Sequence, residues 1–241
     1  MELLKPNLTV SNTDGYIAVS PTQSSTTLAD ARNATTATGI NTNLNFLYCV
    51  HSGFFSRYYI FRPFFFFDFS GNDDDGTSLS GQTVSAAALE FTTTANISGV
   101  ISWTVETDKK VMVCKTDGVG SSVDTGDWNR LDNWPSSGSY EGVITKYGEV
   151  NQAANASLSI TLSAQAITDI NAAISGGSIF SMCILTEDDW TLSSDLCSSS
   201  NALEGIRILS GNSTTKPKLN LTYGAAPAAA TDNATFFGTN F

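Results

Sequence analysis

The chain has 241 residues, only 15% of them charged, and a net charge of −11. This acidity argues against nucleic acid as a partner, because phosphate binding needs Lys and Arg to displace counterions. A chain of this length can bury a substantial core as one large domain or two small ones. Its many Ser, Thr, Asn and Gly residues favour β-structure with long loops.

Residues 1–15 are expected to form an N-terminal arm. Leu3 and Leu4 make an apolar tip, which Pro6 and a polar NTDG turn then separate from the first apolar run. No apolar segment follows the single Lys5, so the start does not have the pattern of a secretory signal. Export by a standard route is therefore not expected.

From residue 16 to residue 223, short apolar runs alternate with turn-rich loops, which is the pattern of an all-β sandwich. We expect strands at 16–19, 43–50, 56–70, 85–94, 99–107, 110–117, 142–150, 156–162, 178–185, 206–210 and 217–223.

One helix is predicted, over residues 163–175. Ser163 can cap its first turn, and Gly176–Gly177 can end it. Ile167, Ile170 and Ile174 recur at the spacing of one helix face, which is expected to lie against the core.

The most apolar stretch is RYYIFRPFFFFDFSG, residues 57–71. It contains two Arg, one Pro and one Asp, whereas a transmembrane helix needs roughly twenty apolar residues, so no membrane span is expected. Alternate residues of a strand face opposite sides, and both sides are largely apolar here. This predicts a central strand covered on both faces, with a bulge or a break into two strands at Pro63. The two sets are Tyr59, Phe61, Pro63, Phe65, Phe67 and Phe69 on one side, and Tyr58, Ile60, Arg62, Phe64, Phe66 and Asp68 on the other.

The last residues, 224–241, change to a Pro- and Ala-rich composition that ends in Phe236, Phe237 and Phe241. These three rings have no local apolar partners. We expect a C-terminal arm that packs either on its own domain or on a neighbouring chain.

The four cysteines match no zinc-site spacing. Cys49 and Cys183 lie in apolar runs, where a thiol behaves as a small hydrophobic group. All four cysteines, including Cys114 and Cys197, are expected to be reduced. A Cys183–Cys197 link is the one local alternative.

Two stretches carry a family resemblance. The aromatic run followed by TVSAAALEF is similar to the opening pattern of DNRLRE-type β-sandwich domains, and IRILSGNSTTKPKLNLTY resembles the closing hairpin of that family. Between them, DTGDWNRLDNWP is similar to its tryptophan-bearing loop. The matching positions are Arg57, Phe67, Asp68, Phe69, Ser70, Ala88, Leu89, Ser210, Pro217, Leu219 and Tyr223.

This resemblance covers residues 16–223 and implies a jelly-roll-like antiparallel sandwich of the carbohydrate-binding-module type. Such modules are non-catalytic parts of cell-surface and polysaccharide-acting proteins. The chain departs from the pattern in its longer loop at 71–83 and in its two terminal arms.

Nothing in the sequence indicates an enzyme. His51 is the only histidine, no serine lies in a G-x-S-x-G elbow, and no nucleotide-binding fingerprint is present. Carboxylates cluster at Asp73–Asp75, at Asp124 and Asp127, and at Glu187–Asp189, all in loop-like sequence that favours solvated turns over a glycosidase pair.

Two binding sites are conceivable. Asn72 and the following aspartates could supply oxygen ligands to Ca²⁺, although their spacing is not that of an EF-hand, so no cofactor is expected. Trp128, Trp134 and Trp190, near Asp and Asn residues, could stack on sugar rings, with Trp128 and Trp134 as the preferred contacts; the alternative is that these tryptophans belong to the core or anchor loops.

The expected function is that of a non-catalytic structural protein of a bacteriophage virion, assembled in the host cytoplasm. It would be a capsid decoration, head-fibre or tail-associated protein and a homo-oligomer. Its arms would dock Leu3, Leu4, Phe236, Phe237 and Phe241 on neighbouring subunits. The alternative is a carbohydrate-binding module for surface polysaccharide.

Overall fold

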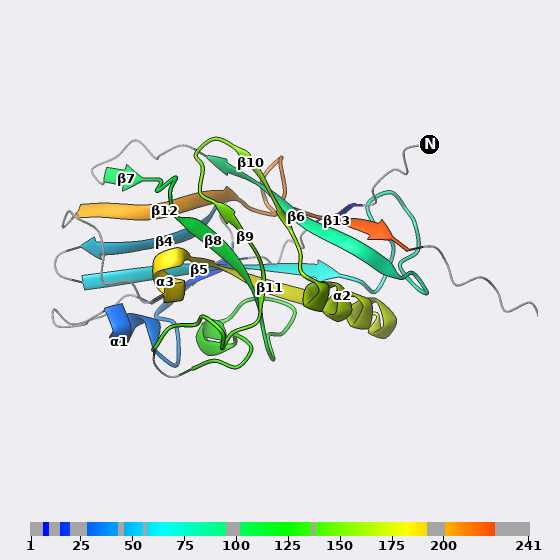
Figure 1. The fold of residues 1–241 in the computed structure, drawn as a ribbon, viewed down its shortest axis with the longest axis horizontal. Helices are drawn as coiled ribbons and strands as arrows, with labels where there is room; N and C mark the ends of the chain where they lie inside the picture. The colour runs from blue at the N-terminus through cyan, green and yellow to red at the C-terminus, as the bar shows by residue number, and fades with distance from the viewer. Residues whose placement is uncertain are drawn as a thin grey trace, which may run out of the picture.

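A computed structural model describes residues 7–9, 15–19, 28–42, 46–54, 57–94, 102–135, 138–191 and 201–224. These residues form an antiparallel β-sandwich with few short helices, which confirms the expected all-β class (Figure 1). Among them, no helix combines the length and the hydrophobicity needed to cross a bilayer.

The first sheet has the strand order β1-β13-β6-β10, and all its pairs are antiparallel. Its strands are β1 (Asn7–Thr9), β6 (Val84–Thr94), β10 (Ser157–Thr161) and β13 (Lys218–Tyr223).

The second sheet has the order β12-β4-β5-β11-β8-β9, with β2 on β5, β3 on β2, and β7 parallel to β12. Two residue pairs between β6 and β12 join it to the first sheet at one corner. Its strands are β2 (Gly15–Val19), β3 (Gly39–Asn41), β4 (Phe46–Phe54), β5 (Arg57–Asp68), β7 (Ser102–Thr104), β8 (Lys110–Lys115), β9 (Lys146–Asn151), β11 (Ile179–Thr186) and β12 (Asn201–Leu209).

The predicted helix is α2 (Ala164–Gly176). The Ser163 side chain accepts a hydrogen bond from the Ala166 N–H, and Gly177 ends the helix in the left-handed conformation at φ 54°. Ile170 and Ile174 are buried against the core, as their spacing predicted. The sequence did not reveal three further short helices: α1 (Leu28–Arg32), α3 (Glu187–Thr191) and the 3₁₀ helix η1 (Thr125–Asn129).

The aromatic strand β5 is covered on both faces, as its alternation predicted. Phe65, Phe67 and Phe69 belong to the core between the two sheets. Phe64 and Phe66 belong to a second apolar cluster on the other side of the sheet. Segment 116–145 and α1 cover that outer side, and Figure 1 shows them together below β5 and β11. Segment 116–145, excluding residues 136–137, is called the loop layer below.

Pro63 does not break β5 in two, which corrects one expectation. Along one edge of β5, residues 57–61 pair with β4 and residues 64–68 pair with β11. Pro63 therefore lies where the partner strand changes along that edge, and along the other edge it pairs with Tyr16 of β2.

The N-terminal arm is also corrected in part. Residues 7–9 are not an arm but the edge strand β1, with Asn7 opposite Asn220 of β13. At the other end, the Gly224 N–H donates to the Thr83 carbonyl at 2.7 Å. The arm residues Leu3, Leu4, Phe236, Phe237 and Phe241 lie outside the described residues.

Candidate functional site

A buried charge cluster holds the loop layer to the second sheet. At its centre is Arg62 of β5, which has no exposed surface although it lies among aromatic residues. Its Nε and Nη2 donate to the two carboxylate oxygens of Asp189 in α3, at 2.7 and 2.8 Å. Its Nη1 donates to the Trp128 carbonyl and its Nη2 to the Tyr140 hydroxyl, each at 2.9 Å. One side chain thus joins the sheet to α3 and to two positions of the loop layer.

Arg32, at the end of α1, is a second buried guanidinium in this cluster. Its Nε donates to the Asp189 carbonyl at 2.7 Å and lies 3.5 Å from the same carboxylate that Arg62 binds. Its guanidinium also lies 3.4 Å from the centre of the Tyr140 ring and donates to the Gly138 carbonyl. In return, the Trp128 indole N–H donates to the Arg32 carbonyl at 3.2 Å.

Two cations therefore share one buried anion. Burial opposes the charged form of Arg62, but attraction by Asp189 and Tyr140 outweighs it and raises the Arg62 pKa. For Arg32, burial dominates over the attraction of Tyr140 and Asp189, and it lowers the Arg32 pKa. Burial also raises the pKa of Tyr140, so its hydroxyl stays protonated and can accept from Arg62 while neutral. All these groups face one another, so the cluster stabilises the loop layer and presents no open reaction site.

The tryptophans of the predicted sugar platform lie in or against one apolar cluster but differ in exposure: Trp128 and Trp190 are buried, whereas Trp134 is half-buried. Trp128 lies in η1 and is fully buried, with the Arg62 guanidinium 3.9 Å from its ring centre. Of the two roles considered for Trp128, the structure shows the core or loop-anchoring one and not the glycan contact, because neither face of its ring is open to a sugar. Trp134 is half-buried and packs on Tyr140 with 5.2 Å between ring centres.

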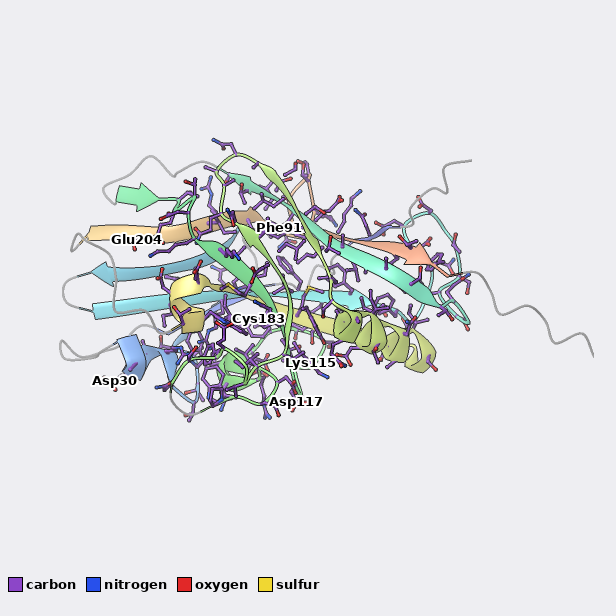
Figure 2. All side chains as sticks on the ribbon, viewed as in Figure 1. Asp30, Phe91, Lys115, Asp117, Cys183 and Glu204 are labelled. Carbon is purple, nitrogen blue, oxygen red and sulfur yellow. The ribbon has the colours of Figure 1, made fainter. Side chains whose placement is uncertain are left out.

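Trp134 borders a shallow polar depression of about 440 Å³ on the loop layer. Its other polar lining residues are Asp117, Asn129, Arg130, Asp132 and Asn133. Figure 2 shows Asp117 at the lower margin of the molecule, far from the first sheet. An indole beside carboxylate and amide groups is an arrangement that can bind a polar ring.

Asp73, one of the aspartates considered for Ca²⁺, has both carboxylate oxygens engaged within the protein. One oxygen of Asp73 accepts from the N–H groups of Asp75 and Thr77, at 3.1 and 2.8 Å. The other accepts from the Tyr223 hydroxyl at 2.9 Å. Within the described residues, no three His, Cys, Asp or Glu side chains converge as metal ligands would.

The other two carboxylate clusters also contact backbone and cations. Asp124 and Asp127 form a capping box at the start of η1. Asp188 accepts from the Lys109 ammonium at 3.0 and 3.1 Å, and Glu187 accepts from the Lys110 N–H at 2.7 Å. His51 lies in β4, but its side chain is outside the described residues.

Sequence reasoning missed the two arginines at the centre of the cluster. Arg62 had a signal, because a lone cation interrupts the apolar set of β5, and a charge in such a place needs a buried partner. Arg32 had no such signal, since it lies in a short polar segment.

No family model and no curated protein matches the chain.

Proposed function

We propose that this protein is a non-catalytic structural component of a large symmetric assembly, a bacteriophage virion, and that it docks on neighbouring subunits through its terminal segments. The observation that carries the proposal is the pairing of the first and last strands, β1 and β13, at one edge of the sandwich. Both terminal segments are therefore attached side by side.

The register supports a shared direction for the two segments. Asn7 lies opposite Asn220, and the strands are antiparallel. The N-terminal end of β1 and the C-terminal end of β13 therefore lie at the same end of this strand pair. The segment with Leu3 and Leu4 and the segment with the three phenylalanines are the ones joined to these two strand ends.

The energetics suit repeated docking. Burial of each such side chain contributes roughly 1.5–3 kcal/mol before the cost of ordering the segment. A single contact of this kind is modest. Repetition over a symmetric array makes the same contacts durable, because each further contact becomes intramolecular.

A non-catalytic role is supported by what the acidic residues contact. Asp73, Asp124, Asp127, Asp188 and Asp189 each bind backbone, hydroxyl or cationic partners within the scaffold. The resemblance to non-catalytic sandwich modules points the same way.

The test is sedimentation of a lysate of the natural source, followed by peptide mass spectrometry of the gradient fractions. We expect the protein to travel with megadalton particles beside a major shell or tube protein. A variant that lacks residues 225–241 should fold but fail to enter the particles. Wild-type protein that stays at the top of the gradient would refute the assembly role.

The second candidate function is carbohydrate binding at the Trp134 depression. The half-buried indole beside Asp117, Asp132 and Asn133 favours it. Affinity electrophoresis through gels that contain neutral or acidic polysaccharides tests it: Trp134→Ala should lose the retention that wild type shows. Val143→Ala, at an exposed apolar position of the same layer, is the matched control. Equal migration of wild type in gels with and without polysaccharide would reject this function.

A further inference from the structure

Two cysteines face each other across neighbouring strands of the second sheet. Cys114 of β8 and Cys183 of β11 are direct partners in the antiparallel register. Directly opposed residues of such a pair have their side chains on the same face. Both belong to the apolar cluster beneath the loop layer, and both are fully buried and in the thiol form. Figure 2 shows Cys183 near the centre of the molecule.

This placement meets the geometric needs of a disulfide. Opposed residues of an antiparallel pair have Cα atoms about 4.5–5.5 Å apart, and disulfides join Cα atoms about 4.4–6.8 Å apart. The Cβ atoms of directly opposed residues lie about 4.5–5.5 Å apart, whereas those of a disulfide lie about 3.5–4.5 Å apart. The two Cβ atoms therefore need to approach by at most about 1 Å to enter the disulfide range. A register shift between Val113 and Cys114 in the β8–β9 pair gives β8 a local irregularity at which it can adjust.

We propose that Cys114 and Cys183 form a cross-strand disulfide when the protein meets an oxidising disulfide in solution, and that this bond locks β8 to β11 beneath the loop layer. The proposal is independent of the docking role. It also differs from the Cys183–Cys197 link that the sequence left open, because Cys114 is the partner that the register places opposite Cys183.

The reaction is two successive thiol–disulfide exchanges. One cysteine loses its proton, and its thiolate attacks a sulfur of glutathione disulfide and expels a glutathione thiolate. The second cysteine then loses its proton and attacks the protein-bound sulfur of the mixed disulfide, which expels the second glutathione thiolate. The protein loses two hydrogens, and the oxidant becomes two glutathione thiols.

The loop layer sets when this reaction can occur. Trp128, Tyr140 and Trp190 lie in the same apolar cluster as the two sulfurs and exclude the oxidant. Burial also raises the pKa of Cys183, so the reactive thiolate is scarce in the closed protein. Oxidation therefore requires the loop layer to open, and its rate should follow that opening.

The test starts from the full chain with all thiols reduced, incubated with glutathione disulfide under native conditions and in urea below the unfolding transition. After free thiols are alkylated, trypsin releases residues 111–115 with Cys114. A second protease that cuts before Asp188 separates Cys183 from Cys197. We expect a peptide pair linked through Cys114 and Cys183, an intact mass lower by two hydrogens, and faster formation in urea.

Two variants complete the design. Cys49→Ala with Cys197→Ala keeps only the facing pair and should still form the bond and raise its urea midpoint on oxidation. Cys114→Ala should show neither effect. A Cys183–Cys197 peptide, or mixed disulfides alone, would overturn the proposal. So would the lack of any Cys114–Cys183 link after refolding in glutathione disulfide.

Discussion

The buried charge cluster predicts an unequal outcome for its two central partners. Arg62→Met removes one of two cations and leaves Asp189 facing Arg32 at 3.5 Å. Asp189→Asn removes the carboxylate that both guanidiniums share, and among the described residues no other carboxylate is paired with either. Loss of Asp189 should therefore destabilise the protein more than loss of Arg62, although the two residues share the same ion pair.

The magnitudes follow from the contacts. Arg62 makes four hydrogen bonds: two to Asp189, one to the Trp128 carbonyl and one to the Tyr140 hydroxyl. Methionine fills most of the volume, so Arg62→Met mainly leaves acceptors unpaired, at about 3 kcal/mol in total. Asp189→Asn should cost about 5 kcal/mol, the upper end for a broken buried pair, because two cations lose their partner.

Urea unfolding at neutral pH, followed by tryptophan fluorescence, measures both free energies of unfolding. Lys146→Met is the control, because it removes a half-exposed pair with Glu149 (2.6 Å) and should cost less than about 1 kcal/mol. The reasoning is refuted if Arg62→Met costs as much as Asp189→Asn, or if either costs no more than the control.

Two further substitutions test the packing and the titration of the sandwich. A Cβ at Gly148 would lie 2.5 Å from an Ile160 methyl, so Gly148→Ala should lower the free energy of unfolding in urea by about 1–3 kcal/mol. Gly120→Ala is the control and should lower it far less, because a Cβ there would have open space around it. Equal losses would contradict the close approach at Gly148. Burial raises the Tyr147 pKa most, and the hydrogen bond that its hydroxyl donates to Asp169 at 2.7 Å raises it further. The Tyr147 hydroxyl therefore contributes to stability below about pH 10, and this contribution is lost as the pH rises towards the folded pKa. Tyr147→Phe should therefore lower the urea midpoint at neutral pH, and above about pH 10 its midpoint should fall less steeply with pH than that of the wild type. Curves of midpoint against pH that run parallel for the two proteins would contradict this.

The elements that the sequence predicted are those in which local pattern and packing agree. Strand β5 was found because its alternation is apolar on both sides, and both sides are covered in the structure. Helix α2 was found because its cap residues and its isoleucine spacing agree. Such signals lie within about a dozen residues, so no knowledge of the tertiary structure is needed to use them.

The charge cluster was not predictable in the same way. Arg62 and Asp189 are 127 positions apart in the sequence, and their pairing depends on α3 folding back over the outer face of the sheet. The sequence pattern groups Asp189 with its acidic neighbours as a solvated turn, which is wrong, because α3 is buried on the outer face of the sheet. For Trp128 the sequence leaves a sugar contact and a core or loop-anchoring role open, and the structure shows the second, because segment 116–145 forms a covering layer with its own apolar cluster. No local periodicity indicates this layer. The three-residue strands β1 and β3 are too short to show any alternation.

The two candidate functions lie on different parts of the molecule, so they can be tested separately. The terminal segments join the chain at the β1–β13 edge, whereas the Trp134 depression lies on the loop layer, on the other side of the second sheet. Because Arg62 and Tyr140 hold Trp134 from below, the indole is presented at a fixed position, which lowers the entropic cost of binding a ligand.

This separation predicts independent effects in one pair of variants. Deletion of residues 225–241 should abolish incorporation into particles and leave any polysaccharide retention unchanged. Trp134→Ala should do the reverse. If Trp134→Ala abolished incorporation while its urea midpoint stayed at the wild-type value, the loop layer itself would be the docking surface. The terminal segments would then lose their assigned role.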